Sequence, residues 1–125
     1  MRWIFRIVTA LYISAIFLFT GSPIVSDLSP LNPYSLLHIV VYGILTLLLA
    51  VSLSFGMRGR GKRIHWKRLL LIGSIALFVG IADEIHQSLF ETRNASAMDV
   101  VLDLIGIGLA LFAVSRLSNR RVRST

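Results

Sequence analysis

Acidic residues are concentrated in two short segments of this sequence, and both segments repeat polar side chains at helical spacing. The segment IADEIHQ contains Asp83, Glu84 and Gln87, and the segment MDVVLD contains Asp99 and Asp103. Residues three or four positions apart share a helix face, so Asp83 and Glu84 would each lie beside Gln87, and Asp99 would lie beside Asp103. Carboxylates held close together repel one another unless they share a proton or a hard cation such as Mg²⁺ or Ca²⁺. These residues could therefore support acid–base catalysis or cation binding.

Two further groups could complete such a site. His38, Tyr42 and Thr46 form a stripe with a spacing of four residues, in which the imidazole could act as a base or a ligand. Arg93 stands apart from the other basic residues, and a guanidinium can hold a phosphate or carboxylate through two hydrogen bonds. The alternative is a purely structural role, in which all of these groups form hydrogen bonds and ion pairs between helices without any ligand.

The elements that must position these residues are four apolar stretches, each close to the roughly 20 residues that a membrane-spanning helix needs. They cover residues 3–19, 35–55, 67–89 and 98–115, approximately. Of the 125 residues, 55% are hydrophobic and only 15% are charged, whereas soluble domains carry about 25% charged residues. We therefore expect an all-α fold, a single four-helix transmembrane bundle. The first stretch could alternatively be a signal peptide, although it lacks a clear small-x-small cleavage site.

Small residues within the third and fourth stretches predict close helix packing. The third stretch contains Gly73, Ala76 and Gly80, and the fourth contains Gly106, Gly108 and Ala110. Small side chains allow membrane helices to approach each other closely. We expect these positions to lie between helices.

The basic residues predict the orientation of the bundle. Except for Arg93, every Lys and Arg lies at the start of the first stretch, between the second and third or at the very start of the third, or after the fourth. If each stretch crosses the membrane once, these regions share one side, and the positive-inside rule makes that side cytoplasmic, together with both termini. Anionic head groups explain the basic loop, so we expect no nucleic-acid partner. The acidic residues then lie toward the outer side.

In sequence order, the chemistry-bearing residues follow a pattern that resembles the VanZ-like membrane family. The pattern is a His in the second helix with a Tyr four residues later, D-E-x-x-Q ending the third helix, an Arg in the next loop, an Asp opening the fourth helix and a Gly seven residues later. The resemblance covers roughly residues 35–110. The matching positions are His38, Tyr42, Asp83, Glu84, Gln87, Arg93, Asp99 and Gly106.

Three positions depart from the family pattern. Glu91 and Thr92 stand where the family usually has Pro-Gly, Asp103 replaces a usual Asn, and Ser35 stands where a basic residue is frequent. Asp103 adds an ionisable group, and the altered loop could change the position of Arg93.

The resemblance implies a multi-pass protein of the bacterial plasma (inner) membrane. The founding member of the family is associated with low-level resistance to the glycopeptide teicoplanin, but the resemblance brings no established reaction. On this basis we expect binding, with or without modification, of a lipid-linked or lipid-like substrate at the outer leaflet. Catalytic groups would be Glu84, Asp83 and Asp99, and substrate-binding groups would be Arg93, His38, Gln87, Tyr42 and Asp103.

The expected partners are membrane lipids, a lipid-linked envelope precursor or lipoglycopeptide, and a second copy of the chain. The sequence requires no cofactor, and it leaves open both a bound metal and whether the protein is an enzyme. One alternative function is a non-catalytic membrane scaffold or accessory subunit. Another is a small ion-coupled transporter, although four spans are few for transport and the ionisable groups are concentrated in the outer half.

Overall fold

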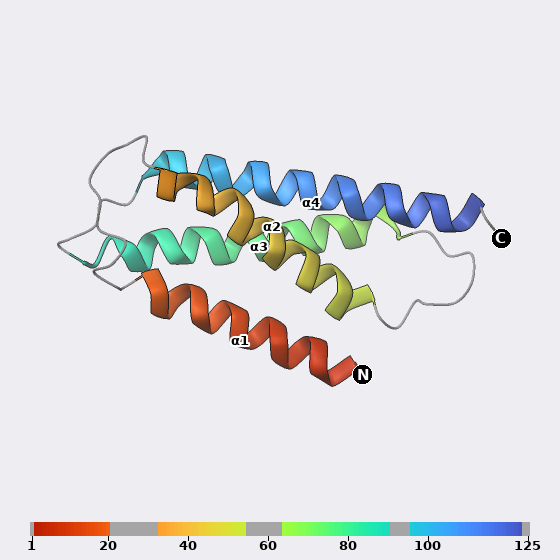
Figure 1. Cartoon of the computed structure of the whole chain (residues 1–125), viewed down its shortest axis with the longest axis horizontal. Coiled ribbons are helices and arrows are strands. Elements are labelled where there is room, and N and C mark those ends of the chain that lie inside the picture. The colour runs from red at the N-terminus through yellow and green to blue at the C-terminus, as the bar shows by residue number, and fades with distance from the viewer. Residues whose placement is uncertain (1, 21–32, 55–63, 91–95, 124–125) are drawn as a thin grey trace.

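The computed structural model describes residues 2–20, 33–54, 64–90 and 96–123, and these residues form four helices (Figure 1). The helices are α1 (Arg2–Thr20), α2 (Pro33–Ser54), α3 (Trp66–Gln87) and α4 (Ala97–Arg123). They run back and forth in sequence order, so the N- and C-termini lie at the same end of the bundle. The predicted all-α, four-helix architecture is confirmed.

Three of the helices, α2, α3 and α4, are long and apolar enough to cross a membrane. At 1.5 Å per residue, a helix of 22 residues such as α3 is about 33 Å long, close to the thickness of the hydrocarbon core. The apolar stretch of α1, Trp3–Phe19, is shorter, and its crossing stays a prediction. The chain is thus a small multi-pass helical membrane protein.

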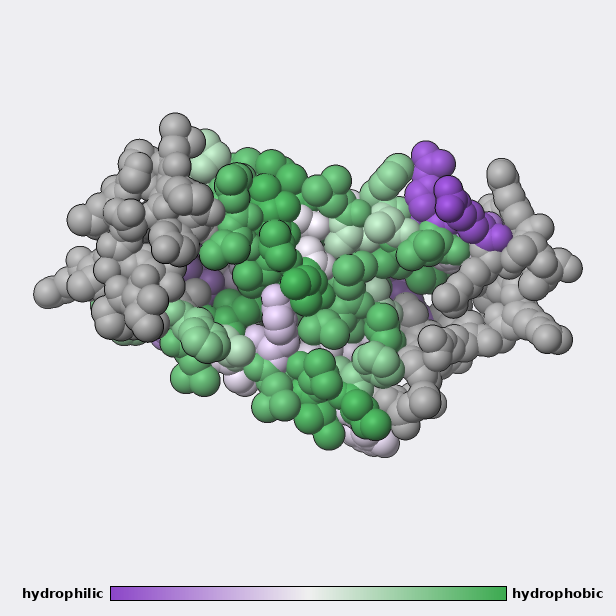
Figure 2. Space-filling view, in the orientation of Figure 1, coloured by the Kyte–Doolittle hydropathy of each residue, from purple (hydrophilic) through white to green (hydrophobic). Residues whose placement is uncertain are grey.

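The outer surface of the bundle is strongly apolar. Figure 2 shows hydrophobic residues spread across the middle of the visible face. Large apolar side chains are exposed on every helix, including Leu18, Leu47, Phe78 and Leu109. Soluble monomers rarely expose such continuous apolar surface, whereas lipid tails would cover it.

The closest helix packing occurs between α2 and α4, which make the most extensive contact in the bundle. A Cβ atom added at Gly106 would clash with the backbone carbonyl oxygen of Ile39. Gly43 lies on the facing side of α2, where an added Cβ would be 3.6 Å from the carbonyl oxygen of Gly106. The two backbones therefore approach each other closely at this crossing, as predicted for Gly106.

The remaining small residues do not all play the same part. An added Cβ at Gly73 would lie 3.0 Å from Leu111 Cδ1, and one at Gly80 would lie 2.7 Å from an Asp103 carboxylate oxygen. Ala76 and Ala110 are buried. Gly108, however, has no described residue of another helix within 4 Å of an added Cβ. The prediction that Gly108 lies between helices is therefore wrong, because it points away from the other helices.

Polar contacts attach α1 to α2. The hydroxyl groups of Thr9 and Ser52 are 2.7 Å apart, and the Ser52 hydroxyl donates to the Phe5 carbonyl oxygen at 3.0 Å. Farther along, the Tyr12 hydroxyl donates to the Val41 carbonyl oxygen at 3.1 Å. These bonds fix the register of α1 against α2.

Candidate polar site between α2, α3 and α4

The described ionisable residues separate by sign along the bundle. All described carboxylates lie at the end where α2 and α4 begin and α3 finishes, which is opposite the termini. They are Asp83, Glu84, Asp99 and Asp103. The described basic side chains lie toward the other end; they are Arg6, Lys67, Arg68, Arg116 and Arg120. This separation agrees with the predicted charge distribution.

Asp103 and His38 connect α4 to α2. Asp103 is completely buried, and one of its carboxylate oxygens, Oδ1, is 2.9 Å from Nδ1 of His38. The imidazole ring also stacks on the Tyr42 ring, with 6.1 Å between the ring centroids. The position of the imidazole is thus set by an acid on one side and an aromatic ring on the other.

Asp83 connects α3 to α2. Its Oδ2 accepts hydrogen bonds from the Tyr42 hydroxyl at 3.3 Å and from Nε2 of Gln87 at 3.0 Å. All three side chains are buried. The expected face-sharing of Asp83 and Gln87 is confirmed by the bond between them.

Glu84 connects α3 to the start of α4. Its Oε2 accepts a hydrogen bond from the backbone N–H of Ser96 at 3.0 Å. Its other oxygen, Oε1, is buried and has no hydrogen-bond partner among the described residues. Burial of an unpaired carboxylate oxygen is costly, so this atom is suited to meet a proton, a water molecule or a cation.

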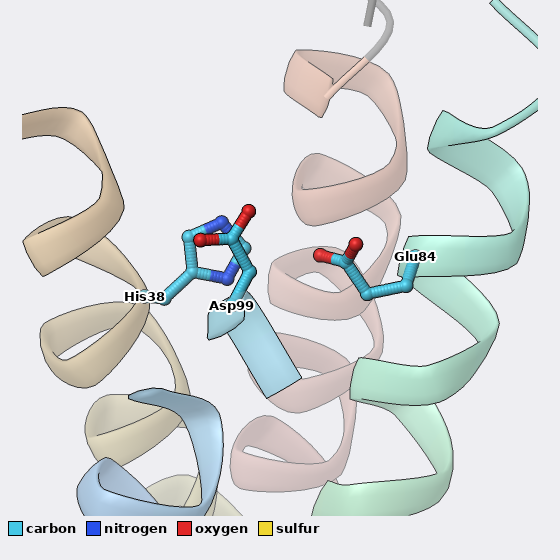
Figure 3. A group of neighbouring side chains, drawn as sticks. All are labelled: His38, Glu84 and Asp99. Atoms are coloured by element: carbon cyan, nitrogen blue, oxygen red, sulfur yellow. The ribbon is translucent and has the colours of Figure 1, made fainter. Parts of the chain in front are cut away.

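Glu84, Asp99 and His38 converge in space although they come from three different helices. Each offers one nitrogen or oxygen atom, and these atoms all lie within 4.8 Å of one another. Figure 3 shows the imidazole ring and the two carboxylates pointing toward a common region. Glu84 is buried, whereas His38 and Asp99 are partly exposed. The arrangement can bind a cation, or it can donate and accept protons.

Not every candidate residue takes part in this convergence. Arg93 lies outside the described residues, as do Glu91 and Thr92 of the altered loop. His86 faces another direction, because its ring lies edge-on to Phe17 of α1 and to Phe90, with centroid distances of 5.5 and 5.1 Å.

Sequence reasoning missed the backbone N–H of Ser96, which orients Glu84. A signal for it was present, because S-x-x-D is a helix N-terminal pattern and Ser96 stands three residues before Asp99. In the structure, the hydroxyl and carbonyl oxygens of Ser96 accept from the backbone N–H groups of Met98 and Asp99, respectively. This geometry leaves the N–H of Ser96 itself for Glu84.

No family model matches the chain, and no curated protein or solved structure compared with it is similar enough to count as a match. The site is therefore interpreted from its own geometry.

Proposed function

We propose that this chain is a VanZ-like envelope protein of the bacterial plasma membrane that binds a lipid-linked or lipid-like substrate at the outer leaflet. The observation that carries the proposal is the convergence of His38, Glu84 and Asp99 from three helices near one end of an apolar bundle. Ionisable side chains inside membrane segments are energetically costly and are typical of functional sites.

The depth of the site suits a molecule with a polar head and an apolar tail. Glu84 lies three residues before the end of α3, which is about 5 Å along the helix axis. Exposed apolar side chains adjoin the site residues in sequence, namely Leu36, Leu37, Ile85, Met98 and Val101. A lipid tail could contact these side chains while its head group reaches the polar cluster.

Each polar group has a distinct role in the proposed binding of the substrate. Glu84 and Asp99 would exchange protons with the head group or hold a cation beside it. His38 would orient the head group, with Asp103 supporting the imidazole. Arg93 would bind an anionic portion of the substrate, which is the part that its sequence position suggests.

A scaffold without catalytic activity is the second candidate, and one observation favours it. Asp83 is engaged by Tyr42 and Gln87, and Asp103 by His38, so part of the cluster already links helices to one another. In that case the polar residues would stabilise a binding surface for another membrane protein.

Antibiotic susceptibility in the source bacterium tests the proposed function. A strain lacking the gene is complemented with the wild type, with Glu84→Gln, or with Lys67→Gln as a matched charge-removing control at the opposite end of α3. We expect deletion to increase susceptibility to teicoplanin and lipoglycopeptides. Wild type and Lys67→Gln should restore tolerance, and Glu84→Gln at equal membrane abundance should not.

The other outcomes separate the two candidates. Full complementation by Glu84→Gln would favour the scaffold, because a neutral amide can preserve packing but cannot exchange a proton. If deletion leaves susceptibility unchanged, the link to glycopeptides does not apply to this protein.

A further inference from the structure

We propose that His38, Glu84 and Asp99 form a binding site for one divalent transition-metal ion, with Zn²⁺ as the best-matched ion. One ligand atom from each residue lies within 4.8 Å of the other two. Because the three residues belong to α2, α3 and α4 (Figure 3), a bound ion would join three helices, at the end of the bundle opposite the termini (Figure 1).

An independent observation at Glu84 points to a positively charged ligand. Glu84 is only 7% exposed, and its Oε1 is buried without a hydrogen-bond partner in the described part of the chain. The second oxygen is held by the Ser96 N–H at 3.0 Å, which fixes the direction of the carboxylate. Figure 3 shows this carboxylate directed toward Asp99 and His38. A cation there would satisfy an oxygen that the helices leave unpaired.

The surroundings of His38 are those of a metal-binding imidazole. Its Nδ1 is 2.9 Å from Oδ1 of Asp103, so its Nε2 is the ring nitrogen left to face Glu84 and Asp99. Histidine ligands in proteins commonly donate their second ring N–H to a carboxylate, which fixes the ring orientation and makes the ligand more basic. Asp103 is placed to accept that bond, and in this proposal it is a positioning residue.

The ligand types select among metals. Zn²⁺ binds imidazole nitrogen and carboxylate oxygen, and its catalytic sites use three protein ligands with a fourth position open. Mg²⁺ and Ca²⁺ prefer oxygen ligands throughout, and Mn²⁺ binds imidazole more weakly than Zn²⁺. At bond lengths of about 2.1 Å, tetrahedral ligand atoms are roughly 3.4 Å apart. Binding therefore requires small side-chain rotations that bring the three atoms closer together.

The proposed cation site shares residues with the proposed lipid site but does not rest on lipid binding. The open fourth position would face the partly exposed side of the cluster, where His38 and Asp99 lie. It could accept water or an oxygen of a substrate head group.

Metal titration of the purified full-length chain tests this inference. The protein is prepared in detergent without a polyhistidine tag, and Zn²⁺ is added in a calorimeter, with bound metal counted by mass spectrometry. We expect one Zn²⁺ per chain. His38→Ala and Glu84→Gln should each weaken binding by about 100-fold or more, and Asp103→Asn by about 10- to 100-fold through the loss of imidazole support.

The matched control removes a different imidazole. His65 caps the opposite end of α3, where its side chain accepts from the Lys67 N–H. His65→Asn keeps a capping residue and should leave Zn²⁺ affinity unchanged. Circular dichroism checks the folding of each variant. Binding of Co²⁺ to the wild type, followed by visible absorption, gives a second readout that needs no variant.

Three results would overturn the inference. They are the absence of saturable Zn²⁺ binding by the folded wild type, a loss of Zn²⁺ affinity in His65→Asn as large as that in His38→Ala, and a Co²⁺ spectrum typical of a fully hydrated ion. Because the titration contains neither antibiotic nor substrate, its failure would leave the proposed function untouched. Failure of the susceptibility test would likewise leave the cation site untouched.

Discussion

At the residue scale, the bond between His38 and Asp103 is the best-defined polar link between α2 and α4. The carboxylate is completely buried, and its second oxygen, Oδ2, has no hydrogen-bond partner among the described residues. Removing either partner leaves the other polar group unsatisfied in an apolar environment, which costs more than the bond itself contributes. The two residues should therefore be energetically coupled.

A double-mutant cycle measures this coupling. We expect His38→Ala and Asp103→Ala each to lower the free energy of unfolding, and the double variant to lose less than the sum, with a coupling energy of about 1–2 kcal/mol. Unfolding in mixed detergent micelles with increasing dodecyl sulfate is the measurement. His38→Ala combined with the distant Thr9→Val is the control and should be additive. Additivity in the His38–Asp103 cycle would contradict the expected link.

Helical spacing was enough to predict which residues of one helix share a face, but not which partner each residue meets on another helix. Asp83 and Gln87 follow directly from the i, i+4 rule. The pairing of His38 with Asp103, and the placing of Asp99 near Glu84, depend on the rotation of α4 about its axis. No pattern within a single helix encodes that rotation.

At the element scale, the crossing of α2 and α4 depends on one glycine. An added Cβ at Gly106 would meet the backbone carbonyl of Ile39, and backbone atoms cannot rotate away as a flexible side chain can. Gly108 provides a matched control, since an added Cβ there meets open space.

We expect Gly106→Ala to destabilise the protein by about 1–3 kcal/mol because the two helices must separate. Gly108→Ala should be neutral or stabilising by up to about 1 kcal/mol, because alanine favours helix more than glycine does. The same detergent unfolding assay compares the two variants. Equal effects of the two substitutions would show that the crossing is not limited by backbone contact.

Gly108 was wrongly predicted to lie between helices because its angular position relative to Gly106 was not considered. Residues two positions apart on a helix of 3.6 residues per turn point in directions about 200° apart. Gly106 and Gly108 therefore could not both face α2.

The predicted end of the fourth span at residue 115 also differs from the end of α4 at Arg123. The apolar residues predict only the part of α4 that contacts lipid. The helix itself continues to Arg123 because the arginines that follow have a high helix propensity.

At the scale of the whole molecule, the separation of charge predicts which end of the bundle faces the cytoplasm. The positive-inside rule places the end carrying the termini inside the cell, and the polar site would then face outward. The chain has no cysteine, so any introduced cysteine is the only reactive thiol.

We expect Ala97→Cys to react with a membrane-impermeant maleimide in intact cells, and Arg120→Cys to react only after the membrane is opened. Both side chains are exposed, at opposite ends of α4. Trp3→Cys, at the start of α1, should behave as Arg120→Cys does if α1 crosses the membrane. Labelling of Arg120→Cys but not Ala97→Cys in intact cells would reverse the orientation and move the polar site to the cytoplasmic face.

The overall architecture was predictable because the hydrophobic composition and the lengths of the apolar stretches are enough to predict a bundle of membrane helices. The first helix is the exception, since Trp3–Phe19 is near the lower limit of spanning length. Its hydrogen bonds to α2 through Ser52 and Val41 could not be read from the sequence, because they join a side chain to a distant hydroxyl or backbone carbonyl.

The sequence separation of His38 and Asp103, 65 residues, has a consequence for the synthesis of the protein. At about 5–20 residues per second, the ribosome adds Asp103 to the chain roughly 3–13 s after it adds His38. During this interval the imidazole enters the membrane without its carboxylate partner. The nascent α2 must therefore wait with His38 near the water interface or beside the insertion machinery, and the arrival of α4 completes both the polar site and the insertion of the chain.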